Sequence, residues 1–110
     1  MSATAGDDVR IVDEPGRQRY EARVGDVVAA FLEYRSVGTR TILVHTEVDA
    51  SMEGRGIGGR LVAGALDDLR ARGRRITVKC PFVAAFLERH PGYRDLVAGA
   101  TGTSSQERPA

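Results

Sequence analysis

EGRGIGGR, residues Glu53 to Arg60, is the stretch that decides the fold of this chain. It is compatible with three kinds of phosphate-binding loop. Read from Gly54 it fits the dinucleotide fingerprint G-x-G-x-x-G, and its outer glycines fit the G-x-x-x-x-G frame of a P-loop. It also fits a glycine-rich turn that opens a helix and holds a pyrophosphate. The sequence on either side distinguishes these possibilities.

The residues before this stretch are patterned as antiparallel strands. A short strand is predicted at Arg10–Asp13, closed by the turn signal Glu-Pro-Gly. Apolar and charged residues alternate over Arg17–Val24, as in a strand with one exposed face, whereas Val27–Tyr34 is apolar on both faces. A turn at 36–39 leads into Thr41–Val48, which is rich in β-branched residues. The first half is therefore predicted to be an antiparallel meander.

The residues after the stretch alternate between helix and strand. Apolar residues recur at helical spacing from Ile57 onward, and Gly73 closes this helix. A short strand is predicted at Arg75–Lys79. Pro81 suits the first turn of a second helix, which runs to about Arg89 and is stopped by Pro-Gly. Strand, helix, strand and helix after a meander predict an α+β (mixed α/β) fold.

Composition limits the class of function. At 110 residues the chain has room for one domain, which we expect at 9–97 between flexible tails at 1–8 and 99–110. A net charge of +1 argues against binding to nucleic acid. No apolar run is long enough for a membrane and no leader is visible, so a cytoplasmic location is expected. The single cysteine, Cys80, excludes an internal disulfide and a cysteine-based zinc cluster, and no metal is expected.

Two of the three loop types conflict with the neighbouring residues. A P-loop requires Lys and then Ser or Thr after its last glycine, where this chain has Arg60 and Leu61, and leucine cannot bind magnesium. The dinucleotide fingerprint follows the first strand of a parallel sheet and requires an acid about 20 residues further on. That distance leads here to Val78–Cys80, which contains no carboxylate.

The third loop type fits the position of the glycines at a strand-to-helix junction. There the free backbone N–H groups and the helix dipole attract an anion, and residues without Cβ atoms let a pyrophosphate approach. Three glycines among the four residues Gly56 to Gly59 would cost helix stability without a structural need, which favours a binding role. The alternative is a glycine-rich turn that only begins the helix.

Four segments together resemble the GNAT-type (Gcn5-related) acetyltransferases: the run from Ile42 to Arg70, the HTEV within it, the step Cys80-Pro81 and the HPGY at 90–93. In that family a strand is followed by Q/R-x-x-G-x-G/A and a long helix. The chain is most similar to the short single-domain subgroup that lacks the usual amino-terminal helices. The resemblance covers about 9–97 and implies a reduced GNAT-like fold.

The resemblance also implies where a cofactor binds. The strand ending at Val48 would separate from the next strand, and the pantetheine arm of acetyl-CoA would fill the gap, held by backbone groups around Glu47 and Val48. Glu53 stands where the family has Gln or Arg, and Arg55 or Arg60 is expected to substitute for it. The residues expected at the cofactor are Val48, Gly54, Arg55, Gly56, Ile57, Gly58, Gly59, Arg60, Cys80 and Phe82.

The activity that the resemblance implies is transfer of an acetyl group from acetyl-CoA to a primary amine. The acceptor, whether a protein, a peptide or a small amine, stays open. One alternative is a CoA-binding module with little or no catalysis, and another is an interaction protein that keeps the fold without binding CoA. The chain is expected to be a monomer or a weak dimer, with Arg17–Val24 as an exposed edge strand.

An amine acceptor must lose a proton before it attacks, so a general base is expected near the thioester. Strand alternation predicts that Leu43, His45 and Glu47 share one face, beside the proposed gap. His45 and Glu47 are therefore candidate catalytic residues. The alternatives are a hydrogen-bonded core histidine and a solvated glutamate at the strand end.

Two further residues are catalytic candidates. Cys80 precedes a helix start, where the dipole lowers a thiol pKa, and it could carry the acetyl group or protonate the departing thiolate. Its alternative role is that of a small buried residue that lines the cofactor channel and touches pantetheine. Tyr93 is a candidate general acid, as a tyrosine near the last helix is in many relatives, or it packs the final turn.

Overall fold

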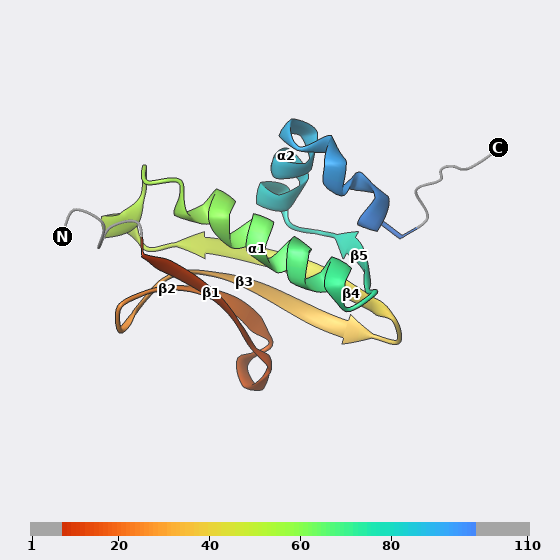
Figure 1. Cartoon of the computed structure of the whole chain (residues 1–110), viewed down its shortest axis with the longest axis horizontal. Helices are drawn as coiled ribbons and strands as arrows, with labels where there is room; N and C mark the ends of the chain where they lie inside the picture. The colour runs from red at the N-terminus through yellow and green to blue at the C-terminus, as the bar shows by residue number, and fades with distance from the viewer. Residues whose placement is uncertain (1–7, 99–110) are drawn as a thin grey trace.

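The computed structural model describes residues 8–98, which form one five-stranded sheet and two α-helices (Figure 1). The strands lie side by side in chain order, antiparallel throughout except for the parallel pair β4 and β5. They are β1 (Val9–Glu14), β2 (Arg19–Val24), β3 (Val27–Val37), β4 (Arg40–Val48) and β5 (Arg75–Val78). The predicted α+β fold, a meander followed by strand, helix, strand and helix, is confirmed.

Helices α1 (Ile57–Ala71) and α2 (Pro81–Arg89) pack on the same face of the sheet. Helix α1 crosses the face over β1 to β4, and α2 lies beside it against β4 and β5. The buried positions of α1 recur every three or four residues, as an amphipathic helix requires: Ile57, Gly58, Leu61, Val62, Ala65, Leu66 and Leu69. Neither helix within residues 8–98 has the length and apolarity that a membrane span requires.

A close approach fixes α1 against the edge strand β1. A Cβ atom at Gly64 would lie 2.8 Å from Cγ1 and 3.0 Å from Cβ of Ile11, which is shorter than real Cβ contacts. Only a glycine at this position lets the isoleucine pack directly on the helix backbone. The first strand of the sheet is thereby held to the core.

Two buried tyrosines tie the far end of α1 to the sheet. The Tyr20 hydroxyl donates to Asp68 at 2.6 Å and the Tyr34 hydroxyl donates to Asp13 at 2.5 Å. Both carboxylates also pair with Arg72, at 3.0 and 3.2 Å. Burial, followed by the hydrogen bonds to these carboxylates, raises the pKa of both tyrosines above the ordinary value of 10.0.

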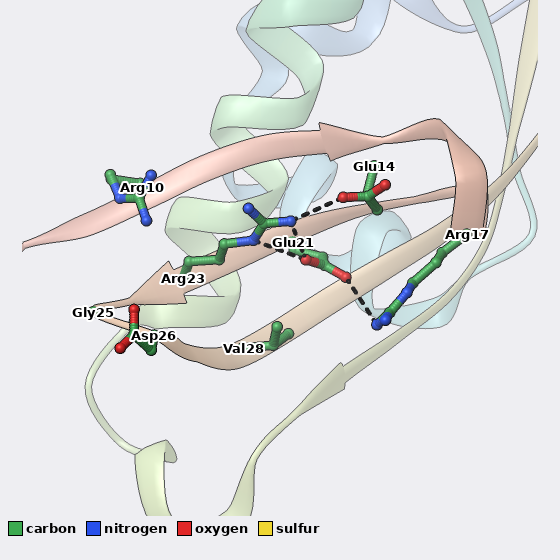
Figure 2. A pocket seen from close by; sticks show the side chains of 8 residues that line it. All are labelled: Arg10, Glu14, Arg17, Glu21, Arg23, Gly25, Asp26 and Val28. Carbon is green, nitrogen blue, oxygen red and sulfur yellow. Dashed lines mark hydrogen bonds and ion pairs between the residues drawn. The ribbon is translucent and has the colours of Figure 1, made fainter.

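The opposite face of the sheet carries no helix within residues 8–98, and we call it the open face. Two rows of paired residues cross it, Arg19–Glu33–His45 and Glu21–Phe31–Glu47, each running from β2 through β3 to β4. On its β1 and β2 side, arginines surround one carboxylate (Figure 2). Glu21 is only 1% exposed because the side chains of Arg17, Arg19 and Arg23 cover it.

Two expectations about strand positions are wrong. The strand 17–24 is not an edge strand: Pro15–Arg17 is a 3₁₀ turn, and β2 lies between β1 and β3 with both sides paired. The edges of the sheet are β1 and β5. The turn expected at 36–39 is shorter, because β3 continues through Ser36 and Val37 before the left-handed Gly38 reverses the chain.

A β-bulge in β4 overturns the predicted sharing of one face by Leu43, His45 and Glu47. Tyr34 pairs with Leu43 and Glu33 pairs with His45, so Val44 is left without a partner. The extra residue shifts the alternation by one position. Leu43 is consequently buried on the helix-covered face, whereas the His45 and Glu47 side chains lie on the open face.

Candidate functional site

The strands β4 and β5 separate halfway along β4. Their pairing ends at Leu43 and Val78, where the N–H groups of Lys79 and Cys80 both donate to the Leu43 carbonyl, at 2.9 and 3.1 Å. The chain then turns into α2, while β4 continues to Val48 still paired with β3 but no longer with β5. A gap therefore opens beside the last residues of β4.

The backbone of β4 faces this gap at two residues. The Asp49 N–H donates to the Ala29 carbonyl on β3 at 2.8 Å, so by alternation Glu47 also directs its backbone towards β3. The N–H and C=O groups of Thr46 and Val48 consequently face the side from which β5 has departed. These groups are what an extended ligand chain can pair with.

The glycine-rich stretch forms the turn between β4 and α1. Gly54 and Gly56 have φ angles of +85° and +74°, which only glycine adopts without strain. Helix α1 begins at Ile57, and no side chain of residues 8–98 caps it. The N–H groups of its first turn therefore point out of the helix end without an intrahelical acceptor, at the positive end of the dipole.

The glycines of the turn do not share one reason for being glycine. A Cβ atom on Gly58 would lie 2.6 Å from Cζ of Phe82 and 3.2 Å from a methyl carbon of Val48, so packing of α2 against α1 requires this glycine. The expectation that these glycines lack a structural need is therefore wrong for Gly56 and Gly58. It holds for Gly59, where no atom of the described part of the chain lies within 4 Å of an added Cβ atom.

A cavity of about 520 Å³ lies between the end of β4, the glycine turn and α2. Seven of its lining residues are among those predicted for the cofactor: Val48, Gly54, Gly56, Ile57, Gly58, Gly59 and Phe82. Thr46, Met52, Glu53 and Arg89 complete the lining, and sequence reasoning did not select them as cofactor contacts. Arg55 and Arg60 are exposed beside the turn and do not line the cavity.

Arg89 is the basic residue that the cavity receives from α2. It lies seven residues after Phe82, so both side chains leave the helix on the same face. That spacing was the available signal, but it required knowing that this face of α2 turns towards α1. Glu53, by contrast, brings a negative charge to the lining at the position where the resemblance implies an amide or a cation.

Cys80 lies at the base of the gap and is buried, with 2% of its surface exposed. Its Sγ atom is 3.2 Å from the Thr46 hydroxyl across the separated strands. The thiol does not line the cavity. Cys80 therefore packs behind Thr46, which does line the cavity, and is shielded from solvent.

His45 and Glu47 lie together on the open face, next to the gap. The His45 Nε2 atom is 2.9 Å from Oε2 of Glu47, and their side chains are 49% and 62% exposed. The imidazole and the Phe31 ring also lie in an edge-to-face arrangement, with their centroids 6.3 Å apart. A histidine that is hydrogen-bonded to a carboxylate and open to solvent can accept a proton from an approaching ligand.

Tyr93 is not brought to these residues. It lies in the 3₁₀ helix Pro91–Leu96, packs on Phe86, and donates its hydroxyl to Asp67 in the second half of α1 at 2.8 Å. The hydrogen bond to Asp67, followed by burial, raises the pKa of Tyr93. The structure thus groups Thr46, Val48 and the glycine turn around a cavity, sets His45 and Glu47 on the other face of the same strand, and leaves Tyr93 apart.

Comparison with known proteins agrees with this geometry. The chain matches the family of GCN5-related N-acetyl-transferases over residues 19–96. It is 33% identical over 85 residues to Protein NATD1 of Bos taurus, covering 76% of this chain and 75% of that protein. Its fold is similar to the NMR solution structure of a GCN5-like protein from Staphylococcus aureus, with a TM-score of 0.64, 21% identity, and coverage of 97% of this chain and 100% of that one. The chain therefore belongs to the GCN5-related N-acetyltransferase family, whose members are acyltransferases.

Proposed function

We propose that this protein transfers the acetyl group of acetyl-CoA to a primary amine. The observation that carries the proposal is the separation of β4 from β5 directly beside an uncapped, glycine-rich helix start. An extended arm with amide groups fits the gap, and a diphosphate fits the helix start. The open space at Gly59 is consistent with a ligand that approaches the backbone closely.

The residues around the cavity divide the binding of the coenzyme among them. The free N–H groups of the first turn of α1 would hold the pyrophosphate, with Arg89 at the cavity wall and Arg55 beside the turn supplying positive charge. The backbone groups of Thr46 and Val48 would pair with the pantetheine amides. An N–H group at this edge would also stabilise charge on the thioester oxygen during acyl transfer, an effect that is commonly the largest in such reactions.

The amine would arrive from the open face. Within residues 8–98 the end of β4 has no neighbouring strand on the β5 side, so an amine could reach a group in the gap from the open face. His45 would accept the proton of the ammonium group, and Glu47 would orient the imidazole and stabilise its protonated form. Cys80 would support the Thr46 side chain from behind the cavity lining, and Tyr93 would stabilise the packing of the last turn.

A titration tests the binding part of this proposal. Acetyl-CoA added to the isotopically labelled protein is expected to shift the backbone amide signals of the glycine turn and of 46–48. Signals of β1, which lies three strands away from β4 and contributes no residue to the cavity lining, serve as the internal control. Amides of the glycine turn that do not respond to acetyl-CoA would contradict the proposal.

Turnover tests the chemical part. With amine acceptors, Glu47→Gln and His45→Gln are expected to lower kcat by about a hundredfold or more, as the loss of a general base does, while CoA binding stays intact. Glu14→Gln removes a carboxylate from the same face at the other edge of the sheet and is the matched control. Tight binding without turnover in the wild type would instead favour a CoA-binding module.

A further inference from the structure

Arg19 stands out on the open face because its guanidinium group is fixed in place but only partly used. Its Nε atom donates to Glu21 at 2.8 Å, and the group lies 4.4 Å from the centroid of the Phe31 ring. The side chain is only 20% exposed. Within residues 8–98, however, neither of its terminal nitrogens has a protein acceptor. Glu21 thus orients a pair of N–H donors over an aromatic ring.

Glu33 is the opposite case, a carboxylate without a cation. It pairs in register with Arg19 on one side and with His45 on the other, yet in the described part of the chain it makes no ion pair. Together with Glu47 it makes the His45 end of the open face acidic. An ammonium group is attracted to such a site.

The charges of the open face differ between its two ends. Two carboxylates, Glu33 and Glu47, neighbour His45, whereas the β2 end carries Arg17, Arg19 and Arg23 together with Glu14 and Glu21. Arg17 and Arg23 also lie at that end, but their contacts are to Glu21 and Glu14, as Figure 2 shows. The apolar ring of Phe31 lies between the two ends, within 4.4 Å of the one and 6.3 Å of the other.

We propose that the acceptor is an amine that also carries a carboxylate, with its ammonium group at His45, Glu33 and Glu47, its methylenes on Phe31, and its carboxylate at the terminal nitrogens of Arg19. This inference rests on the proposed acetyl transfer and specifies its acceptor. Arg19 and His45 lie two strands apart, about 10 Å at ordinary strand spacing, which a chain of a few methylenes spans. A diamine of the same length brings its second cation to an arginine and is disfavoured.

Three acceptors of equal length test this assignment: 5-aminopentanoate, pentylamine and 1,5-diaminopentane. Release of CoA from acetyl-CoA gives kcat/KM for each. We expect 5-aminopentanoate to exceed pentylamine by about tenfold or more, as a charge-assisted pair at a half-buried arginine provides, and the diamine to be the poorest. Peptides that differ by Glu or Gln after the amino-terminal residue show whether the carboxylate comes from a peptide or from a free amino acid.

Two variants distinguish recognition from stability. Arg19→Gln is expected to reduce the preference for 5-aminopentanoate to about twofold or less while leaving pentylamine nearly unchanged. Arg23→Gln also removes a partner of Glu21 but leaves the guanidinium group over Phe31, so it should keep the preference. Should Arg19→Gln fail to fold, Arg19→Lys keeps a charge beside Glu21 without the planar fork and should show most of the same loss.

The assignment would be overturned if the kcat/KM values of the wild-type enzyme for 5-aminopentanoate and pentylamine differed by less than twofold. It would also be overturned if the Arg19→Gln variant kept the preference for 5-aminopentanoate. A direct binding experiment separates this failure from failure of the proposed reaction. The three amines are titrated into the protein without CoA, and the Arg19 Nε–H signal is followed by NMR. A shift of that signal with 5-aminopentanoate but not with pentylamine supports the assignment even if no acetyl transfer occurs, and equal responses contradict it.

Discussion

Replacement of two glycines in α1 by alanine should have opposite effects on stability. At Gly59 the added Cβ atom meets no atom of residues 8–98 within 4 Å, so we expect the gain in helix propensity, about 0.5–1 kcal/mol, to determine the effect. At Gly64 the same atom would lie 2.8–3.0 Å from three carbons of Ile11. These include the branched Cβ atom of a strand residue, which cannot rotate away. Overpacking of this kind costs about 1–3 kcal/mol.

The two variants should therefore differ by about 2 kcal/mol in the free energy of unfolding. Urea unfolding followed by far-UV circular dichroism measures this difference, which corresponds to about 1 M in the midpoint for ordinary m-values. A Gly64→Ala protein as stable as Gly59→Ala would refute the seating of β1 on α1. The double variant with Ile11→Ala supplies the control, because removal of the side chain should relieve about 1 kcal/mol or more of the penalty.

Three further predictions concern titration and reactivity. Burial would raise the pKa of Glu21, but hydrogen bonds from Arg19 and Arg23 outweigh burial and hold the pKa below the ordinary 4.5. The ionised carboxylate therefore stabilises the folded protein above about pH 4.5, and this contribution is lost as the pH falls through the folded pKa. Glu21→Gln should therefore lose stability at pH 7 and show a flatter acid dependence in urea unfolding, and an unchanged slope would contradict this. Tyr20 and Tyr34 have raised pKa values, so folding favours their neutral forms and stability should fall above pH 10.0; tyrosinate absorbance from them should appear only as the protein unfolds, not before. Cys80 is 2% exposed and should react with a thiol reagent only slowly until denaturant is added, whereas immediate reaction would place it in an open channel.

The elements of the second half were predictable because local signals mark their ends. The proline at the first position of α2 and the Pro-Gly after it fix Pro81–Arg89, and the structure has the same bounds. The left-handed Gly73 likewise follows the end of α1. Each of these signals acts within a few residues of the chain, so no tertiary information is needed to read it.

The site was only partly predictable, because its remaining features depend on neighbours distant in sequence. Nothing in the β-branched run of β4 marks Val44 as a bulge, since the shift is visible only in the register with β3. The alternation of β2 placed Glu21 on the exposed face, but its burial depends on the arginines that cover it. The requirement for Gly58 likewise comes from Phe82, a residue of the other helix.

The bulge at Val44 divides β4 into two segments whose side chains alternate in opposite phase between the two faces of the sheet. Up to Leu43 the inward positions belong to the core, and beyond it Thr46 and Val48 take over the inward side while His45 and Glu47 look outward. A substitution changes one of these side chains, whereas deletion of residue 44 would move every side chain from 45 to 48 to the opposite face of the sheet. The chemistry of this surface is thus set by chain length as much as by residue identity, and related chains with one residue fewer at this point would present an inverted site on the same fold.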